Sequence, residues 1–409
     1  MPTTCKAFSV VSSDKRPRCL AMTLVFVCSF ATGAQSSQKK ASFAVTGNPF
    51  AAAAGDLDAD GDPDVAVAGL TSDFVNVLRN ESTDGCSAFF EDQVITVHDA
   101  PRSVAIGDVA GDGLADIVVA HNENGAALGR VSIFVNGSIP GQLSFSHFVT
   151  LAIPGPPTGV NQGATSVVLV DVDLDSDLDI CVTEERGPSN DGLLHVFRRS
   201  SAGNFALANT IVVRPSPVSI ASGHFNLDSV PDVVVACENG DAALLALGPL
   251  HLSAGAIEIR TDCEQTTLAN DDHPAAVVTA RFDDSNEIDD FCVNNIHSES
   301  LRVVLTDDFG ALCVQACTEL DPNDLNEGLA AANLDEDAGG AIDLVVPIRN
   351  GELNGFVGVV RASLPLKTVR VGVEPQGVLI ADFDSDAHLD VLCCNMLSGS
   401  VTIILNPKQ

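Results

Sequence analysis

Short apolar runs separated by loops rich in Gly, Asn, Asp and Pro recur along the chain. Residues 164–213 show the pattern clearly, with apolar runs at 164–172, 178–185, 193–200 and 205–213. Runs of this length without a 3.6-residue periodicity are typical of β-strands rather than helices. The pattern therefore predicts an all-β protein built from units of four short strands.

An acidic loop followed by an apolar strand occurs seven times, beginning with GDLDADGDPDVAV at residues 55–67. The first positions of these loops lie 49 to 63 residues apart, at Asp56, Asp108, Asp171, His224, Arg281, Asn333 and Asp382. Seven four-stranded units at this period predict a seven-bladed β-propeller, in which closure into a ring protects the sheet edges.

The two ends of the repeat array complement each other. The seventh unit ends after SVTIILN (400–406) and lacks a last strand, whereas the segment KKASFAVTG (39–47) precedes the first acidic loop. We expect this N-terminal segment to supply the missing strand of the seventh blade and to close the ring.

The N-terminus has the order of a secretory signal peptide. Basic residues at positions 6, 15, 16 and 18 precede the apolar run 19–31, and the small residues of ATGAQ (31–35) follow it. The apolar run is too short to span a bilayer. The sequence thus predicts a signal peptide over residues 1–34, cleaved after Ala34, and a propeller over 35–409. No other segment has the character of a membrane span, so we expect a secreted or extracytoplasmic protein, in the periplasm or at the cell surface.

Composition narrows the class of partner. The chain has 55 Asp and Glu against 21 Lys and Arg, with a formal net charge of −34, which disfavours nucleic acid and anionic membranes as partners. It contains no Trp and no Tyr, the side chains on which sugar-stacking sites usually depend. Five cysteines follow acidic loops in apolar runs, and we expect them to be small buried hydrophobic residues: Cys181, Cys237, Cys292, Cys393 and Cys394.

The motif DxDxDGxxD, placed between two strands and repeated, resembles the FG-GAP and VCBS repeats of integrin α-subunit propellers and of many secreted bacterial proteins. The resemblance covers essentially everything after residue 34. It implies that the loop binds Ca²⁺ through alternate side chains and one backbone carbonyl near the seventh position. Carboxylate oxygens are ligands that Ca²⁺ prefers, and their crowding is costly without a cation. An EF-hand fits poorly, because the twelfth position is Val67, Val182 or Cys393 instead of Glu.

Three loops, the first, third and seventh, keep a carboxylate at all four alternating positions, and the sixth keeps most of the pattern with an insertion before its last aspartate. We predict about three to four Ca²⁺ sites on this chemistry. The predicted ligands are Asp56, Asp58, Asp60 and Asp64; Asp171, Asp173, Asp175 and Asp179; Asp382, Asp384, Asp386 and Asp390; and Asn333, Asp335, Asp337 and Asp343.

The remaining loops have lost part of this pattern. The second and fourth loops lack a carboxylate at one or more positions, and in the fifth Arg281 takes the first position beside Asp283 and Asp289. A guanidinium there would replace the charge of a metal. Of the three loops with four carboxylates, only the first keeps its glycine, Gly61, so a positive φ at Ser176 or Ala387 would carry a steric cost.

No motif of a known catalytic site accompanies the repeats. The sequence therefore favours a noncatalytic, exported, calcium-stabilised propeller that binds a protein or polysaccharide partner through one loop face, as a monomer. An extracellular polysaccharide lyase or hydrolase on a propeller scaffold is one alternative, and it would need converging basic and carboxylate groups near the central channel. A purely structural surface or matrix component is another alternative.

Overall fold

The chain divides into two units, Met1–Gln35 and Ser36–Gln409. The computed structural model describes residues 39–406 except 84–86, 98–99, 122–128, 154–162, 187–190, 251–272, 284–286, 307–311, 315–317, 320–324, 335–340, 351–353 and 362–363. The predicted signal peptide lies outside the described residues. Within the described part of the chain, no helix combines the length and the apolar character that a membrane span requires.

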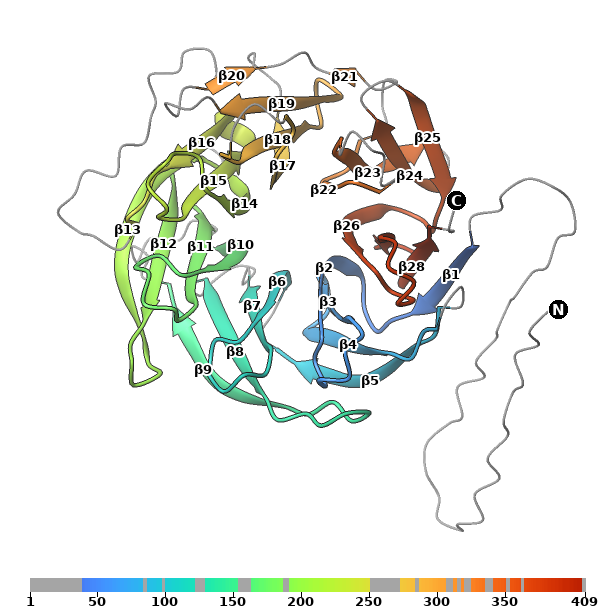
Figure 1. The fold of residues 1–409 in the computed structure, drawn as a ribbon, viewed down its shortest axis with the longest axis horizontal. Coiled ribbons are helices and arrows are strands. Elements are labelled where there is room, and N and C mark those ends of the chain that lie inside the picture. Colours follow the sequence, from blue (N-terminus) through green and yellow to red (C-terminus); the bar gives the residue numbers. More distant parts are fainter. Residues whose placement is uncertain are drawn as a thin grey trace, which may run out of the picture. The chain divides into compact units, whose positions relative to one another are not determined.

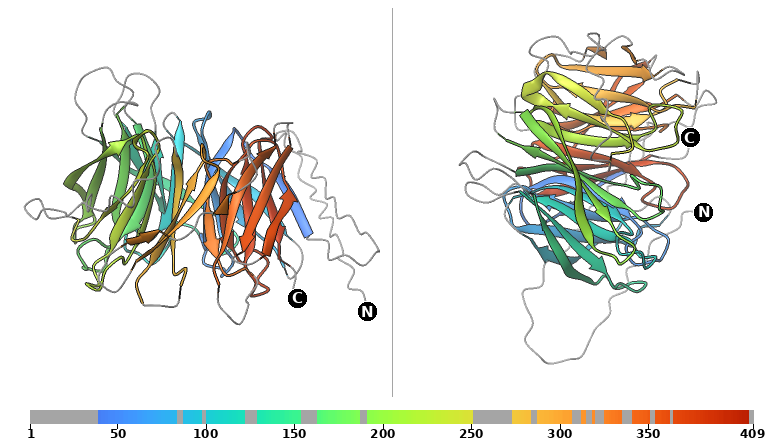
Figure 2. Two further views of the ribbon diagram at one scale, coloured as in Figure 1. Left: turned by 90° about the horizontal axis from the view of Figure 1, so that it is seen from above. Right: turned by 90° about the vertical axis from the view of Figure 1, so that its left-hand side faces the viewer.

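Seven antiparallel sheets surround a central axis, as the repeat pattern predicts (Figure 1). The strands of each sheet run between the two faces of the ring (Figure 2). In each blade the first strand is innermost, and the following strands lie successively farther from the axis.

The first three blades each contain four strands. Blade 1 consists of β2 (Pro49–Gly55), β3 (Asp64–Gly69), β4 (Phe74–Asn80) and β5 (Phe89–Thr96). Blade 2 consists of β6 (Pro101–Gly107), β7 (Asp116–His121), β8 (Arg130–Asn136) and β9 (Phe145–Ala152). Blade 3 consists of β10 (Gly163–Val170), β11 (Asp179–Glu185), β12 (Asp191–Arg199) and β13 (Phe205–Pro215).

Blades 4 to 6 vary in their outer strands. Blade 4 shows β14 (Pro217–Gly223), β15 (Asp232–Cys237) and β16 (Ala242–Ala246), with a 3₁₀ turn η1 (Glu238–Gly240). Residues 251–272, which come after β16, lie outside the described part. Blade 5 has β17 (Pro274–Ala280), β18 (Asp290–Asn295) and β19 (Ser300–Thr306), and both β20 (Leu312–Val314) and β21 (Thr318–Glu319) pair with β19. Blade 6 has β22 (Ala330–Ala332), β23 (Asp343–Asn350), β24 (Asn354–Arg361) and β25 (Leu364–Arg370).

Blade 7 joins the two ends of the propeller. Its strands are β26 (Pro375–Ala381), β27 (Asp390–Asn395), β28 (Ser400–Leu405) and, outermost, β1 (Lys39–Ala44). β1 pairs antiparallel with β28, from Lys39 opposite Leu405 to Ala44 opposite Ser400. The predicted closure by the N-terminal segment is therefore confirmed. Closure gives the outer edge of β28 a partner from the N-terminal end of the repeat array.

The hydrophobic core lies between the blades. Buried residues form seven clusters, and each cluster joins two adjacent blades, including the seventh and the first. The second residue of the acidic loop contributes to this packing, since Leu57, Val172 and Phe383 are fully buried. The five cysteines expected in the core are buried and free. Each acidic loop is thus anchored by one apolar side chain next to its carboxylates.

Candidate metal centres in the acidic loops

The last aspartate of the acidic loop clamps the blade together. In the first loop Asp64 Oδ2 accepts a hydrogen bond from the backbone N–H of Leu57 (3.0 Å), and Asp64 Oδ1 accepts one from the N–H of Asn80 (2.7 Å). This carboxylate therefore ties the start of the loop to the end of β4. Equivalent pairs of bonds are made by Asp116, Asp179, Asp232, Asp290 and Asp390, and Asp343 accepts the first of the two from Leu334.

The first aspartate of the loop holds the turn. Asp56 Oδ1 and Oδ2 accept hydrogen bonds from the N–H groups of Asp60 (3.2 Å) and Gly61 (3.1 Å), and Asp171 and Asp382 do the same in their loops. The turn requires a left-handed backbone at the position of Gly61, whose φ is 98°. Ser176 and Ala387 adopt φ values of 72° and 69° there. The third and seventh loops therefore take the same backbone path as the first, at a steric cost.

Three of the predicted loops gather carboxylates closely enough to hold a metal ion. In each loop the first, second and fourth aspartates offer one oxygen each, and these oxygens lie within 4.8 Å of one another. The groups are Asp56, Asp58 and Asp64; Asp171, Asp173 and Asp179; and Asp382, Asp384 and Asp390. The predicted third ligands Asp60, Asp175 and Asp386 lie outside these groups and accept hydrogen bonds from the N–H two residues on.

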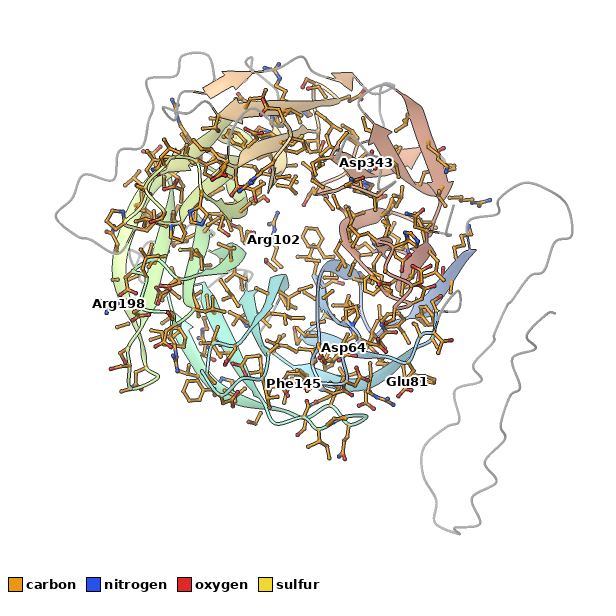
Figure 3. The ribbon with its side chains drawn as sticks, viewed as in Figure 1. Asp64, Glu81, Arg102, Phe145, Arg198 and Asp343 are labelled. Carbon is orange, nitrogen blue, oxygen red and sulfur yellow. The ribbon has the colours of Figure 1, made fainter. Side chains whose placement is uncertain are left out.

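Burial and crowding raise the pKa of the clamping aspartates. Asp64 is fully buried, and desolvation raises its pKa to about 7, with a further contribution from Asp58. Desolvation likewise raises the pKa of Asp390 to about 7 and that of Asp179 to about 6. The two backbone N–H donors oppose the rise in each case. Each cluster therefore carries an electrostatic cost that a bound cation would remove. Figure 3 marks Asp64 in blade 1.

Arginines from β12 reach the third loop, which the sequence pattern did not indicate. Arg198 Nε pairs with Asp173 Oδ2, and Arg198 Nη2 lies 3.9 Å from Asp175. Arg199 pairs with Asp177 and donates a hydrogen bond to the carbonyl of Ala110 in the second loop (2.6 Å). The charge of the third loop is thus partly compensated by protein. The doublet Arg198–Arg199 at the end of a strand was the signal available in the sequence.

The fifth and sixth loops differ from the sequence expectation in part. The repeat alignment placed Asp289 beside Arg281, and their side chains do pair, with Arg281 Nε 3.7 Å from Asp289 Oδ1. The strand register, however, gives the clamping position to Asp290, which faces Ala280 in β17. In the sixth loop Asp335 and Asp337 lie outside the described residues. Asn333 is described, and its buried Oδ1 accepts no hydrogen bond from the described residues.

The donor set fits calcium. All the gathered ligand atoms are carboxylate oxygens, the hard donors that Ca²⁺ and Mg²⁺ take, and no His or Cys belongs to the three groups. Oδ1 of Asp173 is buried and accepts no hydrogen bond within the described structure, which leaves it available to a cation.

Comparisons with known proteins agree with this architecture. The family described as FG-GAP-like repeat matches residues 56–119 and 108–182. A search among curated proteins found no match. Among solved structures, BBS1N in complex with ARL6DN has a TM-score of 0.58 at 14% identity, covering 90% of this chain and 95% of that one.

Two bacterial structures are also similar in fold. A functionally unknown protein from Desulfotomaculum acetoxidans has a TM-score of 0.50 at 14% identity, covering 81% of this chain and 88% of that one. The periplasmic gluconolactonase PpgL of Pseudomonas aeruginosa has a TM-score of 0.51 at 15% identity, covering 84% and 99%. At these identities the likeness concerns the fold alone.

Fold and loops together define the class of protein, a seven-bladed β-propeller with an acidic loop between the first two strands of each blade. The two FG-GAP-like repeat matches lie within residues 56–182, in blades 1 to 3.

Proposed function

We propose that this chain is a noncatalytic, exported propeller that Ca²⁺ stabilises and that binds a protein or polymer partner through the face carrying the acidic loops. The observation behind the calcium role is the gathering of three aspartates in the first, third and seventh loops, with ligand oxygens within 4.8 Å. Each ion would neutralise carboxylates that hold together the start of one loop and the end of the third strand. The ions would therefore act on stability, not on chemistry.

Two exposed leucines support a binding role for the same face. Leu174 and Leu227 occupy the fourth position of the loops in blades 3 and 4, and their exposed fractions are 54% and 71%. Two apolar side chains held this far out on adjacent loops offer a partner apolar contact area on this face. The carboxylates around them favour a partner with basic or hydrogen-bond-donating groups.

An enzymatic role has less support. Among the described residues, His195 lies close to a carboxylate, with its Nε2 2.8 Å from Oε2 of Glu184. Both side chains are fully buried between β11 and β12. A substrate has no access to such a pair. The five described cysteines of the core are also buried, and burial raises the pKa of the Cys237 thiol to about 12, so that a thiolate is disfavoured.

Thermal unfolding with EDTA and with millimolar Ca²⁺, combined with metal counting by mass spectrometry, tests the calcium role. We expect about three bound ions and a clear rise in melting temperature, since Kd values of about 10⁻⁴ to 10⁻³ M are usual for extracellular calcium modules. If no ion is bound and the melting temperature does not change, the aspartates are solvated turns and the proposal is wrong.

Surface variants test the binding face. A partner that binds the calcium-loaded protein should no longer bind the double variant Leu174→Ser, Leu227→Ser. The matched control is Leu397→Ser, because Leu397 is 59% exposed but lies in the turn between β27 and β28, at the opposite end of the strands from the acidic loops. Equal loss with the control variant contradicts a role for the acidic face.

N-terminal sequencing of the exported protein tests the predicted signal peptide, and the sequence should begin at Gln35.

A further inference from the structure

One residue from every blade lines a single cavity on the axis of the ring. Each of these residues lies six positions before the first position of the acidic loop in its blade, on or next to the innermost strand. They are Phe50, Arg102, Thr165, Val218, Ala275, Glu327 and Gln376. We call this set the channel ring. The cavity has a volume of about 460 Å³, including space open to solvent.

The backbone places these side chains toward the axis. In six blades the pairing of the innermost strand shifts at this point, for example between Pro49 and Ala51 and between Pro101 and Ser103. A bulge of this kind leaves one residue outside the ladder and redirects its side chain. Small residues follow the bulge and let neighbouring blades approach: a Cβ on Gly377 would lie 2.6 Å from the carbonyl oxygen of Phe50.

The channel ring combines apolar and charged chemistry at equivalent positions. Arg102 lies near the centre of the ring (Figure 3), and its side chain is only 19% exposed. Its Nη2 lies 3.9 Å from Oε2 of Glu327, and its guanidinium lies 5.7 Å from the ring centre of Phe50. No hydrogen bond joins its guanidinium to another described residue. A guanidinium offers five donors, so most of the hydrogen-bonding capacity of Arg102 is unused.

A second polar group of the channel ring is also unsatisfied. Gln376 is 7% exposed, and its buried Oε1 accepts no hydrogen bond from the described residues. Thr165 differs, because its hydroxyl donates to the carbonyl of Pro217 (2.6 Å) and contacts the hydroxyl of Thr183 (2.8 Å). Buried polar groups are normally satisfied, so the unsatisfied Oε1 of Gln376, in the same cavity as a guanidinium whose one polar partner is Glu327, points to a missing partner.

The arrangement selects one chemical class of ligand. A carboxylate can accept two hydrogen bonds from Arg102, and an ammonium group beside it can donate to Glu327 and Gln376. A zwitterion carries both groups next to each other and has no net charge, so the strongly acidic chain does not repel it. Phe50, Val218 and Ala275 supply an apolar wall for a side chain.

We propose that the channel ring binds the zwitterionic end of a small apolar α-amino acid, with its carboxylate on Arg102 and its ammonium group on Glu327. This site lies on the axis and does not depend on the calcium loops or on the loop face. The proposal therefore stands or falls separately from the proposed function.

Isothermal titration of the full calcium-loaded protein with L-leucine tests the site, with 4-methylpentanoate and isoamylamine as analogues that lack one charged group each. We expect saturable binding of L-leucine and at least about tenfold weaker binding of either analogue. If L-leucine does not bind, the Arg102–Glu327 pair is an internal ion pair only and the proposal is wrong. If 4-methylpentanoate binds as well as L-leucine, the site recognises an anion and the zwitterion assignment is wrong.

Variants locate the binding. Arg102→Met and Glu327→Gln should each weaken L-leucine binding by about tenfold or more. Arg79→Met is the matched control, because Arg79 also lies over a phenylalanine (6.0 Å from the ring centre of Phe90) and beside carboxylates, but in blade 1 outside the cavity. It should leave binding unchanged. Circular dichroism confirms that each variant is folded, and a folded Arg102→Met protein that binds normally overturns the assignment.

Discussion

The first and fifth acidic loops share the clamping aspartate at their end and differ in the residues at their start. In both, the last aspartate accepts two backbone hydrogen bonds: Asp64 from Leu57 and Asn80, and Asp290 from Phe282 and Thr306. The first loop adds Asp56 and Asp58 to a cluster of oxygens. The fifth loop places Arg281 at the first position, paired with Asp289.

The comparison shows that the loop has two separable roles. Six blades show both bonds of the clamp, and in blade 6 Asp343 accepts the first of the two, so the clamp belongs to the fold. Among the described residues, the cluster of carboxylates is present in three loops, and it is the part of the loop on which the proposed metal binding depends. Where the cluster is lost, a protein cation can compensate part of the remaining charge.

The largest effect should come from the clamp, and it should be equal in the two loops. Asp64→Ala and Asp290→Ala each leave two buried backbone N–H groups without an acceptor, which we expect to cost about 3–5 kcal/mol of unfolding free energy. Urea unfolding in EDTA measures both losses. A loss below about 1 kcal/mol in either variant contradicts a shared clamp.

A smaller loss of stability, which depends on calcium, should distinguish the first loop from the fifth. Asp58→Asn keeps an acceptor for the N–H of Gly141 (2.7 Å) but removes a charge from the cluster. With Ca²⁺ in about hundredfold excess over its Kd, the variant should lose up to about 2.7 kcal/mol, whereas in EDTA it should gain a little from reduced repulsion. The metal count should fall by one ion per chain.

Asp283→Asn is the control for this variant in the fifth loop. Because that loop has no cluster in the described residues, the effect of the control should be the same with EDTA and with Ca²⁺. A calcium-dependent effect there would show that Arg281 does not exclude the ion.

Stability of the calcium-free protein should decrease as the pH rises from about 5 to about 7.5. The pKa of Asp64 rises from 3.8 when unfolded to about 7 when folded, so between these values the folded state holds more protons. The favourable contribution is complete below the lower value and is lost as the pH passes the upper one. From Asp64 alone we expect a decrease of about 2.5 kcal/mol, measured by urea unfolding. Asp64→Asn should remove the Asp64 share of this pH dependence and leave the shares of Asp179 and Asp390. Ca²⁺ should reverse the profile, because the ion binds the ionised form.

The smallest effects should come from the arginines. Arg281 is 58% exposed and its pair is 3.7 Å long, so Arg281→Met should change stability by about 0.5 kcal/mol or less, independently of calcium. Arg198→Met should instead tighten calcium binding by a few fold, about 0.5 kcal/mol, because Arg198 competes for Asp173. Titration with Ca²⁺ distinguishes the Arg198→Met variant from the Arg281→Met variant. Equal calcium affinities of the two variants would mean that neither arginine competes with a metal.

Much of the fold could be predicted from local patterns. The seven loops, the strand that follows each of them and the complementary ends of the array gave the seven blades and their closure by residues 39–44. The left-handed backbone at Ser176 and Ala387 followed from their alignment with Gly61. The signal peptide and the bound ion remain predictions, as does the partner.

Other features could not be read from one repeat. An inserted residue in the fifth loop can be accommodated at several points, so only the pairing of Ala280 with Asp290 decides which aspartate clamps. The contribution of Arg198 to the third loop depends on how β12 is paired with β11 and how far its side chain reaches.

The sequence by itself determined the repeat, the blade count and the carboxylates of each loop, because these depend on residues close together in the chain. Only the tertiary structure decided which carboxylates meet and that Arg102 and Glu327 face each other across the axis. Seven residues spread from Phe50 to Gln376 share one cavity because ring closure brings the innermost strands together. Such a site is invisible to any local pattern, since its members are neighbours only after every blade has packed against the next.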